Sequence, residues 1–187
     1  MDERNEALQR HGLMRLPEPW LRGPLDGVSP FFAPLLRSFE MAREDLAQHT
    51  AGLTTEQLWE RPAGAAPVGF HIRHIGGSVE RLIVYLRGRQ LDDRQMKELR
   101  AEMEPGATRE QLLAELDRTL SNAEAVVLAL PLETLTEPRG VGRKELPTTV
   151  IGLIIHIAEH TQRHTGQAVT TARLVRAQST PPADPQE

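Results

Sequence analysis

Hydrophobic positions along this chain recur at intervals of three and four residues, which is the spacing of one face of an α-helix. The pattern predicts helices over about residues 30–51, 68–86 and 150–178, and a further helix between Thr108 and Pro131. We find no alternation of apolar and polar residues long enough to predict a strand of consequence. Four amphipathic helices, each with one face to bury, predict an all-α protein with the architecture of a four-helix bundle.

Local signals mark where these helices begin. Serine followed by proline at Ser29-Pro30 is typical of a helix start. Thr54-x-x-Gln57 predicts a capping box that opens a short helical turn, and Thr108-x-x-Gln111 predicts a second box. For the last helix, either Thr148 or Thr149 can provide the N-cap.

The remaining segments divide the chain into three parts. Residues 1–28 are predicted to form an N-terminal appendage that includes a short polar helix. Residues 29–178 form the bundle, with a charged and part-helical connector at 89–107. Residues 179–187 are rich in proline and are predicted to be a disordered tail.

Composition narrows the classes of function. The 187 residues carry a net charge of −4, which argues against a nucleic-acid-binding protein. No cysteine is present, so any metal must be held by nitrogen and oxygen ligands. The first residues show no secretory signal, and the apolar stretch at 150–158 is too short to span a membrane. We therefore expect a cytoplasmic protein, and spare apolar surface on such a bundle would favour a homodimer.

Five of the seven histidines fall in two clusters within predicted helices: His71 and His74 in the second helix, and His156, His160 and His164 in the fourth. A spacing of four residues turns a side chain by only about 40° and raises it by one turn, roughly 5–6 Å. Two such imidazoles can converge on one ion, and a third from a neighbouring helix would leave a coordination position open, as in catalytic zinc sites.

A pair of histidines at this spacing on an exposed helix usually binds nothing. Here, however, three histidines lie in register on one helix, and the flanking Ile154, Ile155 and Ile157 predict that this helix is largely buried. Buried polar groups without partners are costly, and a metal ion would be such a partner. From spacing alone, both interpretations stay open: a metal site, and histidines that bind no metal.

Three stretches of the sequence resemble the DinB/YfiT-like superfamily, four-helix-bundle proteins regarded as metal-dependent enzymes. HIAEHTQRHTGQ at residues 156–167 looks like the last-helix signature of that family. HIRHIGGS at 71–78 is similar to its second-helix motif, and GLTTEQL at 52–58 to the segment after its first helix. The resemblance extends over about residues 30–175, with the motifs in the family's order.

The resemblance implies that His74, His160 and His164 are the metal ligands. His71 and His156 match flanking positions that more often act as neighbours of the ligands.

The sequence also departs from the family pattern. Arg163 and Thr165 stand where the family often has histidine and arginine, so the roles of those two positions are not carried over.

The function implied is that of a metal-dependent enzyme, a thiol-dependent transferase or a hydrolase, acting on a small molecule. Histidine ligands suit several divalent ions, of which we favour zinc or nickel, and a low-molecular-weight thiol would be the cosubstrate of a transferase. The alternative is a non-enzymatic metal-binding or stress-response protein whose ion stabilises the bundle.

Several other residues have two interpretations each. Glu80 and Glu159 are candidates for orienting a histidine, although surface ion pairs are the commoner role. Three arginines near the predicted ligands are candidates for binding an anionic substrate: Arg73, Arg81 and Arg163.

Glycines and tryptophans near the predicted site also have a structural interpretation. The pair Gly76-Gly77 and Gly166 would allow close approach to the site or tight helix packing. Trp20 and Trp59 are predicted to be packing residues.

Overall fold

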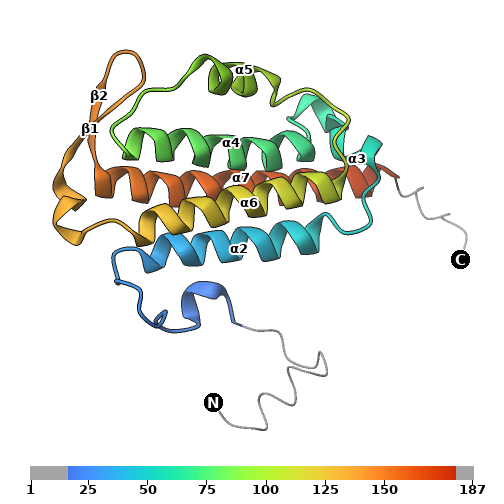
Figure 1. The fold of residues 1–187 in the computed structure, drawn as a ribbon. Helices are drawn as coiled ribbons and strands as arrows, with labels where there is room; N and C mark the ends of the chain where they lie inside the picture. The colour runs from blue at the N-terminus through green and yellow to red at the C-terminus, as the bar shows by residue number, and fades with distance from the viewer. Residues whose placement is uncertain (1–16, 180–187) are drawn as a thin grey trace, which may run out of the picture.

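Four long helices lie side by side in the computed structural model, which describes residues 17–179 (Figure 1). They are α2 (Ala33–His49), α4 (Val68–Leu86), α6 (Arg109–Leu128) and α7 (Val150–Ser179). Helices α2 and α4 each pack against both α6 and α7. The prediction of an all-α four-helix bundle is therefore confirmed, and the second predicted helix matches α4 in both bounds.

Helix starts follow the side-chain caps that the sequence predicts. Both capping boxes form: Thr54 Oγ1 accepts a hydrogen bond from the Gln57 N–H at 3.2 Å, and Thr108 Oγ1 accepts one from Gln111 at 3.3 Å. The first box opens α3 (Thr55–Trp59) and the second opens α6. At Ser29-Pro30 the chain first makes a hydrogen-bonded turn that is not α-helical. The α-helix α2 begins after it, at Ala33.

The apolar faces of the helices meet in a single core between them. Burying a large aliphatic or aromatic side chain stabilises the fold by about 1.5–3 kcal/mol, so these contacts fix how the helices lie against one another. Core side chains that are at most 3% exposed include Leu35, Phe39, Leu46, Ile72, Ile75, Val79, Leu112, Leu116, Leu120, Val127 and Ile157.

A β-hairpin precedes α7, in a stretch where the sequence predicted no strand. Its strands are β1 (Pro138–Val141) and β2 (Leu146–Thr149), paired antiparallel. Each strand has four residues and includes a proline, so no apolar alternation could reveal it. Arg139 Nε donates to the Leu86 carbonyl at 2.7 Å and joins the hairpin to the end of α4. Of the two predicted N-caps, Thr149 caps α7 through a 3.1 Å bond from the Gly152 N–H.

The connector between α4 and α6 contains a short helix, α5 (Asp93–Ala101), as predicted. Figure 1 shows α5 lying outside α4. Asp92 caps it by accepting from the Gln95 N–H at 2.8 Å. Its far end is held by Arg73 of α4, which donates to the carbonyls of Ala101 and Glu104 at 3.2 and 2.5 Å. These bonds fix the position of the residues that follow α5.

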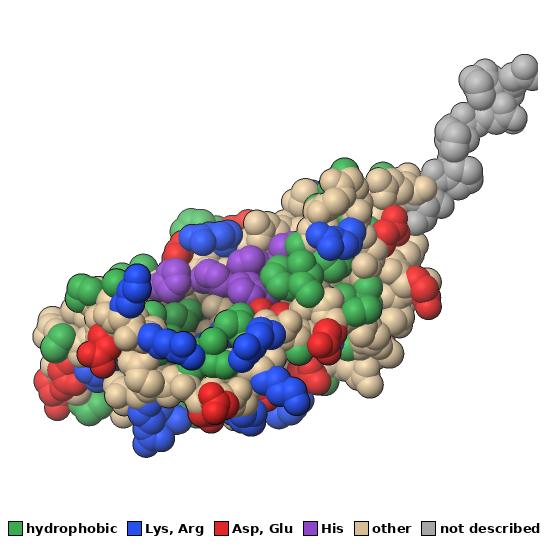
Figure 2. Space-filling model, turned by 90° about the horizontal axis from the view of Figure 1, so that it is seen from above, with side chains coloured by type: hydrophobic (Ala, Val, Ile, Leu, Met, Phe, Trp, Pro, Cys, Tyr) green, Lys and Arg blue, Asp and Glu red, His purple; other side chains and the backbone are tan. Residues whose placement is uncertain are grey.

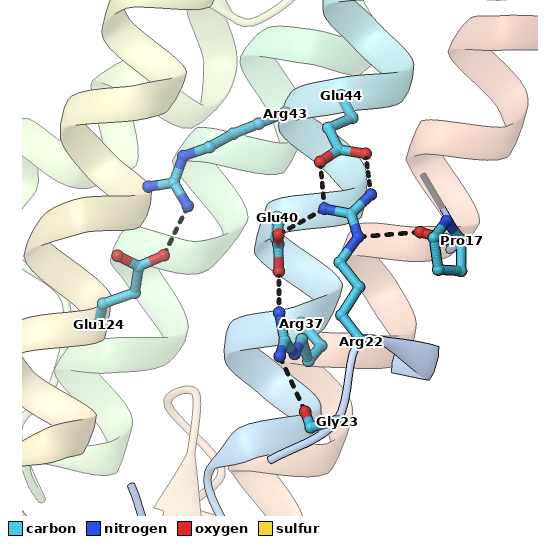
Figure 3. A network of polar contacts seen from close by, with 8 residues as sticks. All are labelled: Pro17, Arg22, Gly23, Arg37, Glu40, Arg43, Glu44 and Glu124. Atoms are coloured by element: carbon cyan, nitrogen blue, oxygen red, sulfur yellow. Dashed lines mark hydrogen bonds and ion pairs between the residues drawn. The ribbon is translucent and has the colours of Figure 1, made fainter. Parts of the chain in front are cut away.

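The described part of the N-terminal segment is attached to α2 by ion pairs (Figure 3). Arg22 contacts Glu40 at 2.6 Å and Glu44 at 2.5 Å, and Arg37 contacts Glu40 at 2.7 Å. Trp20 is 62% exposed, so its prediction as a packing residue is wrong.

Three 3₁₀-helices complete the described elements, at Pro19–Leu21, Pro62–Gly64 and Leu132–Thr136. The polar helix predicted before residue 17 and the disordered tail predicted from 180 on lie outside the described residues. Between residues 17 and 179, no helix has the length and apolar character that crossing a membrane requires.

Candidate metal centre

Three histidines from two neighbouring helices meet at one place in the bundle. His74 comes from α4, and His160 and His164 come from successive turns of α7. Each offers a ring nitrogen, and the three nitrogens lie within 4.8 Å of one another. Figure 2 shows histidine side chains in a row at the surface, beside a hollow. The structure thus brings together the three histidines that the family resemblance singled out.

The three rings are close enough to share one ligand. Their centroids are 4.4 Å apart for His74 and His164, 4.6 Å for His160 and His164, and 5.2 Å for His74 and His160. The four-residue spacing on α7 places two of the rings on one side of that helix. Direct packing of α4 against α7 then brings the third ring opposite them.

Burial keeps the two imidazoles of α7 neutral. Loss of solvent is the largest cause, and together with neighbouring imidazoles such as that of His74 it lowers the pKa of His160 and of His164 to about 4. At pH 7 each ring therefore carries one N–H and one nitrogen lone pair. A neutral imidazole with a free lone pair is the form that binds a metal ion.

Glu102 provides a buried carboxylate behind His74. The residue is 4% exposed, and its Oε2 lies 2.6 Å from Nδ1 of His74. Its other oxygen accepts from Arg81 Nη1, also at 2.6 Å. A carboxylate on the second nitrogen of a metal-binding histidine commonly fixes the orientation and tautomer of the ring.

Sequence reasoning missed Glu102 and considered two other carboxylates instead. Glu159 pairs with His156 at 2.7 Å and with Arg163 at 2.8 Å, and Glu80 pairs with Arg94 at 3.1 Å, so both have the surface role. The capping box at Asp92 could have located α5. Nothing local separates Glu102 from the other acidic residues of the connector, because its burial depends on contacts with α4.

The two remaining histidines of the clusters have different surroundings. His71 is 5% exposed, and its Nδ1 lies 3.1 Å from Nδ1 of His164. Burial, together with the neighbouring His164 and His74, lowers the pKa of His71 to about 4. His156 lies at the surface in its ion pair with Glu159. His71 is thus a direct neighbour of the cluster, and His156 is a surface residue.

The donor set fits a divalent metal ion. Nδ1 of His74 faces a carboxylate and Nδ1 of His164 faces His71, so Nε2 of each ring is left to bind a ligand. With His160, this gives three nitrogen donors, a number and type that suit zinc and its neighbours among the transition metals.

The three arginines considered for an anionic substrate are all engaged. Arg73 binds backbone carbonyls after α5 and lies over the ring of Trp59, 4.7 Å from its centroid. Arg163 pairs with Glu159 on the surface. Arg81 pairs with Glu102. Trp59 donates its ring N–H to the Ala107 carbonyl at 3.0 Å and has the packing role predicted for it.

The glycine pair on α4 has one position where space is essential. A Cβ on Gly77 would overlap Oε1 of Glu102 and lie 2.8 Å from Nη1 of Arg81. A Cβ on Gly76 would meet only side-chain atoms at 3.9 Å, and one on Gly166 would meet nothing within 4 Å. Close approach therefore explains Gly77 and neither of the other two.

This difference gives a matched pair of variants. Gly76→Ala is expected to stabilise the protein by up to about 1 kcal/mol, because alanine favours the helix. Gly77→Ala is expected to destabilise it by about 1–3 kcal/mol, because the carboxylate of Glu102 must leave His74 or Arg81. Urea unfolding of both variants beside the parent protein measures the effect. Equal stabilisation by the two alanines would contradict the packing of Glu102 against Gly77.

Comparison with known proteins agrees with this arrangement. The family model of the DinB superfamily matches residues 38–168. A solved structure of YfiT from Bacillus subtilis superposes with a TM-score of 0.60 at 18% identity, covering 85% of this chain and 94% of that one. That protein is described as "a probable metal-dependent hydrolase with an unusual four-helix bundle topology". At this identity the match bears on the fold alone. No curated protein matches the chain.

Proposed function

The chain belongs to the DinB superfamily, and on that premise we propose that it is a metal-dependent enzyme acting on a small molecule. Its divalent ion would be held by His74, His160 and His164. The observation that carries the proposal is the meeting of three ring nitrogens within 4.8 Å, from two helices and with neutral rings on α7. Zinc or nickel suits these donors best among the ions considered.

The surrounding residues would prepare the ligands for the ion. Glu102 accepts the Nδ1 proton of His74, which leaves the lone pair on Nε2. One of the two facing nitrogens of His71 and His164 must donate to the other. If the Nδ1–H of His164 donates, Nε2 of His164 also keeps its lone pair. Arg81 neutralises the buried carboxylate and holds it in place.

The chemistry follows from three protein ligands. A divalent ion with an open position acts as a Lewis acid, which activates water for hydrolysis or a thiol for transfer near neutral pH. YfiT is described as a hydrolase, whereas the family resemblance of the motifs also supports a thiol-dependent transferase with a low-molecular-weight thiol as cosubstrate. Both reactions use the same three ligands.

The second candidate is a structural metal site that stabilises the bundle without catalysis. Structural zinc sites are usually closed by a fourth protein ligand. Among the described residues, the histidines and acidic groups close enough to share an ion number three, which favours an open site. This count is why we place the enzyme first.

Cobalt substitution tests the proposal, because the absorption spectrum of cobalt responds to its ligands. We expect azide to perturb the spectrum of protein loaded with about one cobalt per chain, since an open position admits small anions. A small thiol should add a sulfur-to-metal charge-transfer band if the enzyme is a thiol transferase. A spectrum that changes with neither additive would favour the structural site.

A further inference from the structure

A cavity of about 840 Å³ lies between α4, α5 and the tip of the hairpin. Its apolar lining comes from Leu82 and Tyr85 of α4, Met96 and Leu99 of α5, and Leu91 just before α5. The volume falls in the range of small-molecule sites, and an apolar lining with a few polar groups is typical of such sites.

The cavity begins about one helical turn from His74 along α4, and its described lining holds no histidine. Ser78, which lines it, follows His74 by one helical turn on α4. Arg81 also lines it and is joined to His74 through Glu102. Figure 2 shows that the row of histidines borders a hollow with hydrophobic side chains in it and lysine or arginine side chains around it. A molecule in the cavity would therefore have one end about one helical turn from His74.

Two arginines at the cavity have no carboxylate partner. Arg100 of α5 and Arg143 of the hairpin tip line the cavity, and neither forms an ion pair with any residue of the part of the chain that the structure describes. Asp93 and Glu145 also line it, so the lining is of mixed charge. Arg100 donates from Nε to the Met96 carbonyl at 3.1 Å, which leaves its two terminal nitrogens without a partner among the described residues. Arg100 and Arg143 are the cationic groups left to bind an anion, since Arg81 is neutralised by Glu102.

A second cavity, of about 520 Å³ between α4, α5 and α6, lacks this combination. Three of its four arginines are engaged within the protein: Arg94 pairs with Glu80 and Glu98, Arg81 pairs with Glu102, and Arg73 binds backbone carbonyls. Acidic residues are numerous in its lining, which includes Glu104 and Glu115. Arg118 has no ion pair among the described residues, but five glutamates line this cavity against four arginines, so its charge disfavours an anion.

We propose that the cavity between α4, α5 and the hairpin binds the substrate, and that this substrate is a small amphipathic anion. Its apolar body would contact Leu82, Tyr85 and the side chains of α5, and its anionic group would bind Arg100 and Arg143. The proposal rests on the proposed function, because it takes the three-histidine site as the place where the bound molecule reacts. Arginine suits carboxylate and phosphate groups alike through its fork of N–H donors.

The test is binding of 4-phenylbutyrate, measured by calorimetry on the metal-loaded protein. Two matched probes have the same apolar body, 4-phenylbutanol without charge and 4-phenylbutylamine with a positive charge. We expect the anion to bind most tightly and the amine least. Arg100→Gln and Arg143→Gln should each weaken binding of the anion by about fivefold and leave the alcohol unchanged. Arg118→Gln is the control, because Arg118 is an exposed arginine that lines the other cavity.

A carboxylate can also coordinate a metal ion, so the same titrations are repeated on His160→Ala, which is expected to lack the ion. The effects of the two cavity arginines should persist there. Anion binding no tighter than that of the alcohol, or an equal loss in Arg118→Gln, would overturn the cavity assignment. Metal analysis of the parent protein distinguishes failure of the proposed metal-dependent enzyme from failure of the proposed anion-binding cavity. Stoichiometric metal with no preference for the anion refutes only the cavity, and anion binding without any metal affinity refutes only the enzyme.

Discussion

Alanine in place of His160 or His164 is expected to abolish stoichiometric metal binding while leaving a helical protein. Each substitution removes one of three ring nitrogens that lie within 4.8 Å of one another. The fold should survive, because α7 is held by buried apolar residues such as Leu153 and Ile157. Mass spectrometry after dialysis should show metal falling from about one ion per chain to none, with an unchanged helical circular dichroism spectrum.

The second helix offers the matched comparison. His74→Ala is expected to lose the ion, whereas His71→Ala is expected to retain it with weaker affinity, because His71 contacts the ring of His164 and is not one of the three converging donors. Metal retained in His74→Ala and lost in His71→Ala would show that His71 is the ligand from α4.

Removal of the Glu102 carboxylate is expected to have the largest effect on stability. Glu102→Ala would leave Arg81, whose side chain is 11% exposed, without its partner in a buried position. Breaking a buried ion pair from one side costs about 3–5 kcal/mol, and loss of a carboxylate behind a metal-binding histidine lowers metal affinity about 10–100-fold. Urea unfolding measures the first effect, and competition with a chelator measures the second.

Glu98→Ala is the control for this substitution. Glu98 lies on α5, four residues before Glu102, but its ion pair with Arg94 is exposed, and such pairs contribute about 0–1 kcal/mol. Metal affinity should not change in this variant. If Glu102→Ala and Glu98→Ala unfold at the same urea concentration and bind metal equally, then the carboxylate at 102 neither supports His74 nor stabilises the fold.

The bundle was predictable because its signals are local. The apolar faces of α4 and α7 repeat at helical spacing, and the caps at Thr54 and Thr108 satisfy backbone groups within one turn. The pair His160 and His164 was predictable for the same reason, since four residues along a helix bring two side chains together. The choice of His74 over His71 came from the family motif, and it stays a prediction until variants are measured.

What the sequence did not predict depends on contacts between distant segments. Glu102 is buried by α4 and by its place after α5, and the sequence around it is that of a solvated connector. The hairpin at 138–149 is held by the bond from Arg139 to the end of α4 as well as by its own short strands. Cytoplasmic location, the absence of nucleic acid as a partner and the homodimer stay predictions.

The predicted metal ligands and much of the cavity wall lie on different parts of the fold. This has a consequence for how related proteins could change their ligand specificity. The ligands lie on α4 and α7, whose backbones are fixed by the core, whereas much of the cavity wall comes from α5 and the hairpin tip. Exposed connecting segments accept substitutions and insertions far more readily than packed helices. Related chains could therefore change what they recognise by altering the residues around 91–100 and 142–145 while inheriting the same reactive centre. Changes in the connector are restricted at Glu102, because any new connector must still place a carboxylate against Gly77 and His74.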